Sequence, residues 1–458
     1  MFEKTKEIDM VHGPLAGKLL LFTIPLICSN LLQILFNAAD VIVVGRFAGD
    51  HSLAAVGSTS SLIALIVQLF VGLSIGANVA AARAIGEGQE KQVRSVVSTA
   101  VAASIVSGFV LLVFGISTSK MLLVWMGTPD EVCGLAVLYM RIYFVGMPFL
   151  MLYNFGSALL RAMGDTRRPL YFLLISGVIN VVLNCIFVIA LHMDVAGVAL
   201  ATVISEGISA ALILRCLIRD DGILHLDWRH MAVDSHALKQ MIRIGLPAGI
   251  QGTLFSLSNV VIQSSVNSFG AVVMAGSAAA VNIGNFVYMS LNAFHQAALS
   301  FNGQNMGAEE FDRVDRVTGL CVLYVTVLGL VLSTGAYVFG PELLRIYTTN
   351  PEVVAAGMVR MKYCIMLYWL CGMMDVMPGC IRGMGFSLTP MVVSLLGSCV
   401  FRLVWVATIF PMQRTIENLY LSYPVSWILT FAIHIVCYVI LRRKLRTMYD
   451  KNTVRNAA

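Results

Sequence analysis

The chain has 458 residues, of which 58% are hydrophobic and 12% are charged, with a net charge of +6 and a mean hydropathy of +0.83. Because soluble proteins carry about 25% charged residues, this composition excludes an ordinary soluble domain. The uncharged run from Leu170 to Leu191 has 22 residues, and roughly 20 apolar residues cross the hydrocarbon core of a bilayer. The sequence therefore predicts an all-α integral membrane protein.

Twelve membrane spans are predicted from apolar runs that charged, Gly or Pro residues interrupt. The tail before the first span mixes acids with its lysines, so we expect the tail to be cytoplasmic and the first span to be retained. The first six spans lie near residues 16–44, 53–81, 95–117, 134–160, 170–191 and 196–218. The other six lie near residues 240–266, 273–303, 317–340, 358–381, 388–410 and 419–441.

Lys and Arg are distributed unevenly between the predicted loops. If both termini are cytoplasmic, the inner segments hold 23 of the 31 Lys and Arg residues. Outer loops and outer span ends hold seven, Arg360 among them, and Arg402 lies inside a span. Because Lys and Arg concentrate on the cytoplasmic side, we expect a multi-pass protein of the cell membrane with both termini inside.

One charged segment occurs twice. RAMGDTRRP, residues 161–169, recurs in altered form as RGMGFSLTP, residues 382–390, and we name these segments the first and second knots. Their shared residues lie 221 positions apart, which predicts an internal duplication. The residues in register include Arg161 and Arg382, Gly164 and Gly385, and Pro169 and Pro390.

The duplication defines the expected domain organisation. A unit of six spans returns the chain to its starting side, so the two repeats are expected to be parallel, with a central cleft between them. The expected parts are an N-terminal six-helix lobe at 1–218, a cytoplasmic linker at 219–236, a C-terminal six-helix lobe at 237–446 and a cytoplasmic tail at 447–458.

Polar residues inside the first-half spans share helical faces. Asn30, Gln33, Asn37 and Asp40 form one stripe, Asn180 and Asn184 a second, and Thr202 and Glu206 a third, while Asn154 stands alone. Polar groups inside a membrane are costly and usually functional. Their oxygen atoms suit Na⁺, and Asp40 could instead carry a proton. Two structural alternatives remain open: Asp40 as a helix cap at the interface, and the asparagines as interhelical packing.

The second half contains different polar residues. Asn285, Tyr288, Asn292 and His295 align on one helical face, and Asp375 lies two turns before the second knot. In the repeat register Asp375 matches Asn154. We therefore treat these five residues as candidates for a second polar site, with a neutral, hydrogen-bonded His295 as the simpler alternative.

Enzymatic classes receive no support from the sequence motifs. The ten cysteines show no CxxC or Cys/His clustering, so no metal site is predicted beyond transient Na⁺ near Asp40. Nucleotide-binding and hydrolase motifs are not found. We expect a protein that is not an enzyme, is monomeric, and has no cofactor and no nucleic-acid partner.

Two segments carry a resemblance to a known family. RAMGDTRRPLYFLLISGVINVVLN and PLICSNLLQILFNAADVIVVGRFAGDHSLAAVG are similar to the multidrug and toxic-compound extrusion (MATE) transporters, in particular their DinF-like prokaryotic branch. The resemblance implies twelve helices in two lobes and export of cationic amphiphiles in exchange for Na⁺ or H⁺. By position, Asp40 matches the essential acid of the family, and Asn154, Asn180 and Thr202 match residues around it. Asn184 departs from the pattern, because close relatives can have Asp there.

The expected function is therefore drug efflux by antiport, through alternating access. The alternative within transporters is a lipid-linked oligosaccharide flippase of the related superfamily. A flippase is expected to have a cationic cavity for pyrophosphate, and Arg402 is the one Lys or Arg that the sequence places deep in a span.

Overall fold

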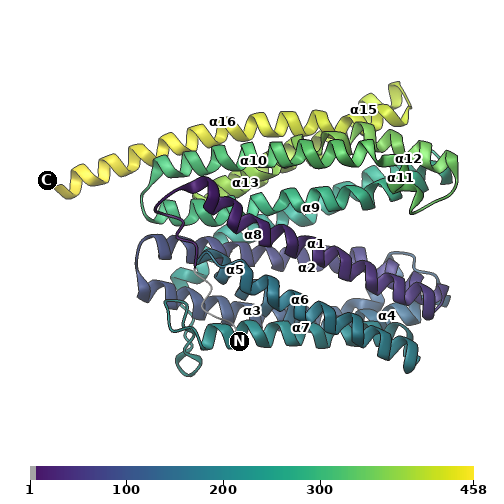
Figure 1. Cartoon of the computed structure of the whole chain (residues 1–458), viewed down its shortest axis with the longest axis horizontal. Coiled ribbons are helices and arrows are strands. Elements are labelled where there is room, and N and C mark those ends of the chain that lie inside the picture. The colour runs from purple at the N-terminus through teal and green to yellow at the C-terminus, as the bar shows by residue number, and fades with distance from the viewer. Residues whose placement is uncertain (1–6, 458) are drawn as a thin grey trace. The chain divides into compact units, whose positions relative to one another are not determined.

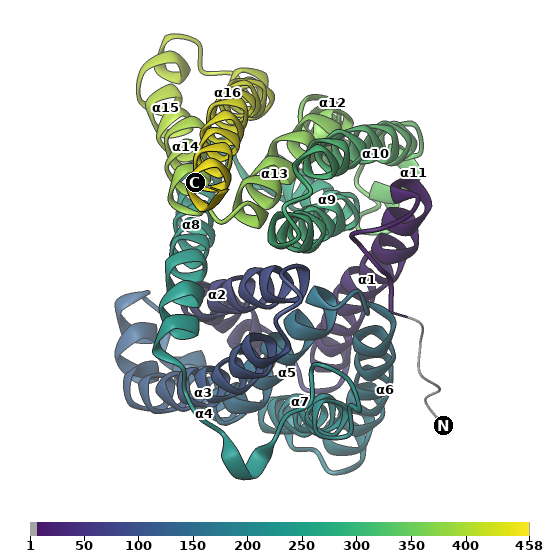
Figure 2. The same cartoon turned by 90° about the vertical axis from the view of Figure 1, so that its left-hand side faces the viewer.

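The structure is a computed structural model that describes residues 7–457, without the side chains of Asp50, His230 and residues 450–457. This part of the chain contains helices and turns but no strand (Figure 1). It divides into two compact units. The first contains Leu20–Thr253, and the second contains Val11–Leu19 and the chain from Leu254 onward. Figure 2 shows the helices of each unit nearly end-on.

The first unit is a bundle whose helices enclose an apolar core. Its strongest helix contacts join α3 to α5, α2 to α5 and α6 to α7. Its elements are most of α1 (Leu15–Phe47), α2 (Asp50–Gly86), α3 (Glu90–Trp125), α4 (Asp130–Val145), α5 (Met147–Ala162), α6 (Arg167–Asn184), the π-helical turn Cys185–Ala190, α7 (Asp194–Ile218), the 3₁₀ turn Trp228–His230 and the first part of α8 (Ser235–Asn267).

The second unit packs mainly around α9 and α13. Its elements are the rest of α8, α9 (Ala271–Gly307), α10 (Phe311–Val338), α11 (Gly340–Arg345), α12 (Pro351–Tyr363), the 3₁₀ turn Ile365–Leu367, α13 (Tyr368–Gly383), α14 (Leu388–Ser394), the π-helical turn Leu395–Val400, α15 (Phe401–Met412) and α16 (Ile416–Ala457). Figure 1 shows α16 extending beyond its neighbouring helices toward the C-terminus.

The helix boundaries repeat with the offset seen in the sequence. Five helices of the first unit begin 221 residues before their counterparts in the second. These pairs are α2 and α9, α3 and α10, α4 and α12, α5 and α13, and α6 and α14. Gly164 and Gly385 in the two knots also share a left-handed backbone, with φ of 98° and 93°. The predicted duplication therefore extends from the sequence to the backbone.

The number of helices able to span a membrane is close to the twelve predicted from the sequence. Ten helices of the described chain are long and apolar enough to cross a bilayer, and α4 with α5, bent by 47°, makes an eleventh. Helix α8, which covers the predicted span at 240–266, is not among these apolar helices. The physical reason is its composition, because Gln, Ser, Thr and Asn residues interrupt its apolar sequence.

The boundary between the compact units differs from the predicted linker at 219–236. It falls inside α8, because the first part of this helix packs closely on α2. A Cβ atom added at Gly72 would lie 2.3 Å from the backbone of Gly249, and one at Gly76 would lie 2.1 Å from the carbonyl oxygen of Met241. Two Gly-x-x-x-Gly motifs thus allow the two helices to touch through their backbones.

The first knot is a packing centre of the first unit. The backbone N–H groups of Arg167 and Arg168 donate to Asp165 Oδ1 at 3.0 and 3.1 Å, which caps the start of α6. The Arg168 guanidinium pairs with Asp165 and lies 3.6 Å from Glu7. The Thr166 hydroxyl donates to the carbonyl of Phe22 at 3.0 Å. The polar side chains of the knot therefore join α1, α6 and the N-terminal segment.

We predict that Gly164→Ala destabilises the protein more than Gly88→Ala. Both glycines have positive φ, 98° and 68°, where alanine costs about 1–2 kcal/mol. Only at Gly164 would the added Cβ collide with a backbone atom, the Ile8 oxygen at 2.4 Å, because Gly88 has open space around it. Thermal unfolding of the purified variants in detergent measures the difference, and equal losses would contradict the role of the knot in packing.

Candidate functional site

The first unit contains a group of polar side chains, which we name the acidic cluster: Asp40, Asn180, Asn184, Thr202 and Glu206. Hydrogen bonds link the first four, and the carboxyl group of Glu206 lies within electrostatic range of Asp40. Asn184 donates its amide N–H to Asp40 Oδ1 at 2.5 Å and to Asn180 Oδ1 at 3.1 Å. Asn180 in turn donates to the hydroxyl of Thr202 at 3.4 Å. Residues from α1, α6 and α7 therefore meet at one point inside the membrane-spanning bundle.

Helical spacing explains how the acidic cluster forms. Asn180 and Asn184 are four residues apart on α6, and Thr202 and Glu206 are four apart on α7, so each pair faces one side of its helix. Phe36 on α1 packs over Gly177, where an added Cβ would lie 1.9 Å from its ring. This contact brings α1 and α6 together, one turn from Asp40.

Two oxygen atoms of the acidic cluster are buried without a hydrogen-bond partner in the described chain. These are Asn184 Oδ1 and Glu206 Oε2. The Glu206 oxygen packs against Gly146, where an added Cβ would lie 2.7 Å from it. Buried acceptors without a donor are costly. A proton on a carboxyl group, or a cation shared between the oxygens, would satisfy such acceptors.

Several other predicted polar residues form no hydrogen bond to the acidic cluster in the described part of the chain. Asn154 donates to the Leu150 carbonyl of its own helix at 2.9 Å. Gln33 and Asn37 are exposed, so of the stripe on α1 only Asp40 joins Asn184. A shared helical face does not determine how far along the helix a neighbour makes contact.

Three residues near the acidic cluster were not predicted. Ser205 accepts a hydrogen bond from Asn180 at 3.4 Å. Tyr139 and Tyr143 on α4 stack with ring centroids 6.0 Å apart, within electrostatic range of both acids. Their spacing of four residues on α4 is visible in the sequence, but that spacing alone does not indicate that they lie near Asp40.

A second polar cluster lies in the second unit. Asn292 donates to Asp375 Oδ2 at 2.9 Å and accepts a bond from Gln296 at 3.3 Å. His295 Nδ1 lies 2.7 Å from the backbone oxygen of Asp375 and 3.8 Å from its Oδ1. Of the predicted residues, α9 and α13 thus bring Asn292, His295 and Asp375 together. Asn285 is exposed and outside this cluster, whereas Tyr288 is half-buried within electrostatic range of Asp375.

Arg360 does not occupy the exposed position at the end of a span that the sequence suggests. It is 6% exposed, and it shares the ring of Tyr423 with Arg402, which is 3% exposed. The second unit therefore buries two neighbouring guanidinium groups, where the sequence indicated one. Only the packing of α12 against α16 reveals this arrangement.

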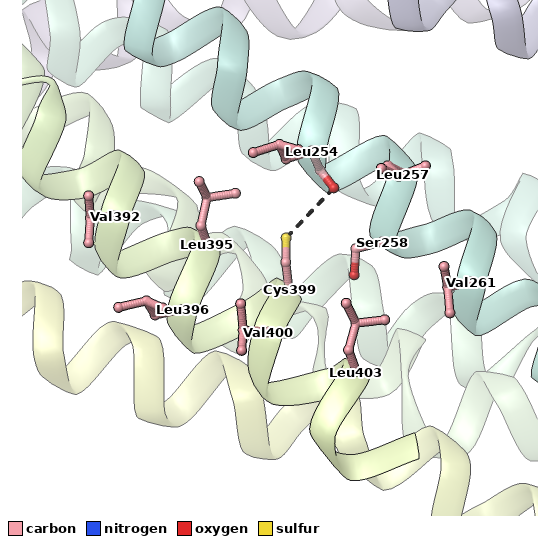
Figure 3. A pocket seen from close by; sticks show the side chains of 10 residues that line it. All are labelled: Leu254, Leu257, Ser258, Val261, Val392, Leu395, Leu396, Cys399, Val400 and Leu403. Carbon is pink, nitrogen blue, oxygen red and sulfur yellow. Dashed lines mark hydrogen bonds between the residues drawn. The ribbon is translucent and has the colours of Figure 1, made fainter. Parts of the chain in front are cut away.

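The second unit also has an apolar pocket of about 480 Å³ between α8 and the segment from α14 to α15 (Figure 3). Leucine and valine side chains line most of it, together with Ser258 and Cys399. The Cys399 thiol points toward the carbonyl oxygen of Leu254 at 3.9 Å (Figure 3). Because the pocket contains no charged side chain, it is unsuited to an ion.

The fold and its polar clusters define a class of protein: a multi-span, all-α membrane protein built from two repeats of six helices. The family model described as MatE matches residues 25–186 and again residues 247–408. The chain belongs to this family, and the resemblance found in its sequence is confirmed. The two matched segments correspond to the two repeats.

Known relatives agree with this assignment. The chain is 30% identical to the probable multidrug resistance protein YoeA of Bacillus subtilis, over 82% of each chain. It is 29% identical to YpnP of the same organism, another probable multidrug resistance protein, over 87% of this chain and 89% of the relative. NorM of Thermotoga maritima is 23% identical over 84% of each.

Solved structures share the fold. An outward-facing multidrug resistance MATE family transporter of the MOP superfamily matches with a TM-score of 0.90 at 21% identity, over 97% of this chain and 99% of the other. A mutant of the Vibrio cholerae MATE transporter VcmN matches with a TM-score of 0.88 at 22% identity, over 94% and 97%. The predicted twelve-helix, two-repeat fold is therefore confirmed.

Proposed function

We propose that this chain is a secondary active multidrug efflux transporter of the cell membrane, with both termini in the cytoplasm. It exports organic cations and other amphiphilic drugs, as a monomer, in antiport with H⁺ or Na⁺. The hydrogen-bonded link from Asp40 to Asn184 carries the proposal, because it holds a carboxylate among polar groups inside a membrane span. The names of the relatives supply the substrate class.

Coupling follows from competition for one negative group. An organic cation binds while the Asp40 carboxylate is ionised, and a proton or Na⁺ displaces that cation after the site opens to the other side. One carboxylate cannot neutralise two cations together, so exchange needs no further mechanical link. Glu206 and Thr202 line the same cluster, and the second polar cluster around Asp375 is proposed as an accessory cation site.

The flippase alternative is not favoured. The named relatives are multidrug resistance proteins, and the acidic cluster is negative where a flippase requires cationic groups for pyrophosphate. The two buried arginines of the second unit are separate from this cluster.

Vesicles that contain the reconstituted protein and a fluorescent organic cation test the antiport. We expect export to stop when one of the two gradients, H⁺ or Na⁺, is collapsed, and to continue when the other is collapsed. Export that is indifferent to both gradients would exclude antiport.

Asn184→Asp tests the position of the coupling site. It places a second carboxylate at hydrogen-bond distance from Asp40, and two such carboxylates must share a proton or a cation. We expect the apparent affinity for Na⁺, measured as Na⁺-dependent thermal stabilisation of purified protein, to increase about 10-fold. Asn350→Asp, at the exposed N-cap of α12 in the other unit, is the matched control and should leave this affinity unchanged. An equal gain in both variants would contradict the proposed site.

A further inference from the structure

The second unit contains two buried arginines surrounded by aromatic rings. We name this group the arginine–aromatic cluster: Arg360, Arg402, Tyr420, Tyr423 and Trp427. The Arg360 guanidinium carbon lies 5.2 and 5.6 Å from the ring centres of Tyr420 and Tyr423. The Arg402 guanidinium carbon lies 4.4 and 5.8 Å from those of Tyr423 and Trp427.

The positive charge of this cluster has no carboxylate beside it. The two arginines donate hydrogen bonds to neutral hydroxyls, from Arg360 to Ser277 at 2.7 Å and from Arg402 to Ser426 at 2.8 Å. Within the described residues neither guanidinium forms an ion pair, and Arg360 Nε and Arg402 Nη2 are buried without a hydrogen-bond partner. Two N–H donors therefore remain unsatisfied in one cluster.

Aromatic rings do not compensate two buried charges. The free energy needed to remove an ion from water is roughly several times larger than the stabilisation from a cation–π contact. A buried water molecule could accept the free N–H bonds, but it would leave both positive charges unbalanced. An anion would satisfy the donors and balance the charge together.

The internal repeat relates residues of this cluster to residues in and beside the acidic cluster of the first unit. With the offset of 221 residues, Tyr423 and Trp427 on α16 correspond to Thr202 and Glu206 on α7. Arg360 on α12 corresponds likewise to Tyr139 on α4. The arginine–aromatic cluster therefore uses, in the second repeat, positions on the helices that correspond to α7 and α4 beside the acidic cluster, and it carries the opposite charge.

We propose that the arginine–aromatic cluster binds a small anion, either a halide such as chloride or the carboxylate of an organic molecule. Guanidinium N–H groups suit both ligands, and the edges of aromatic rings carry partial positive charge that adds to the attraction. This site is separate from the acidic cluster, and its test does not depend on drug export.

Thermal unfolding of the purified protein at constant ionic strength tests the proposal. Isethionate, a bulky anion, is the reference, and chloride or acetate replaces it stepwise. We expect one or both small anions to raise the unfolding temperature saturably, by about 5 °C at saturation. A response to chloride alone indicates a halide site, and a response to acetate indicates a carboxylate site. Equal unfolding temperatures in all three anions would overturn the proposal.

Variants locate the response. Arg360→Gln and Arg402→Gln should abolish it, whereas Arg345→Gln, which changes an exposed arginine of the same unit, should retain it. A full response in Arg402→Gln would overturn the proposed site.

Bromide gives a second measurement that needs no arginine variant, in case those variants do not fold. Because Trp427 is near Arg402, bound bromide should quench its fluorescence saturably, and Trp427→Phe should remove this saturable component. Quenching that increases linearly with bromide in the wild-type protein would contradict binding.

Discussion

Asp40→Asn should abolish gradient-driven export of an organic cation from reconstituted vesicles, with an expected loss of at least about 100-fold. Asparagine keeps the size of the side chain and its hydrogen bonding with Asn184, but it can neither carry a negative charge nor exchange a proton. The fold should therefore persist while the competition between the two cations is lost. Initial export rates at equal protein content per vesicle measure the effect.

The matched control for this experiment is Asp194→Asn. Asp194 is an exposed acid in the first turn of α7, and its φ of 48° is one that asparagine also tolerates. Export by this variant should stay close to the wild-type rate. Normal coupled export by a well-folded Asp40→Asn protein would remove Asp40 from the mechanism.

Gly76→Ala should lower the unfolding temperature of the purified protein by about 5 °C or more. Overpacking typically costs about 1–3 kcal/mol, and here the added methyl group collides with main-chain atoms, which cannot rotate away as a side chain can. The new methyl group would lie 2.1 Å from the carbonyl oxygen of Met241 and 2.9 Å from the backbone nitrogen of Gly245. Helices α2 and α8 must then move apart. Intrinsic tryptophan fluorescence during heating measures the change, together with the monodisperse fraction after size-exclusion chromatography.

Gly57→Ala on the same helix is the control for the added methyl group. Its position has open space within 4 Å, so alanine should leave stability unchanged or raise it slightly, because alanine favours helix more than glycine does. If Gly76→Ala were as stable as Gly57→Ala, the close contact between α2 and α8 would be refuted.

The acidic cluster was predicted in part. The spacing of Asn180 with Asn184 and of Thr202 with Glu206 identified the correct faces of α6 and α7, because a helix fixes the direction of side chains four residues apart. The same reasoning included Asn37 and Gln33, which are exposed, and Asn154, which bonds to its own helix. Periodicity defines a face, but the height at which two helices touch depends on their packing.

The sequence by itself determined the class of the protein, its duplication and its orientation hypothesis. The length of each hydrophobic run must match the bilayer thickness, and the repeat of 221 residues is visible without coordinates. These features therefore depend only on the order of residues along the chain. Tertiary structure decided which polar groups meet. It placed the unit boundary inside α8 through backbone contact with α2, and it brought Arg360 beside Arg402 around Tyr423. Those contacts join residues far apart in the chain, and only helix packing fixes the distances between them.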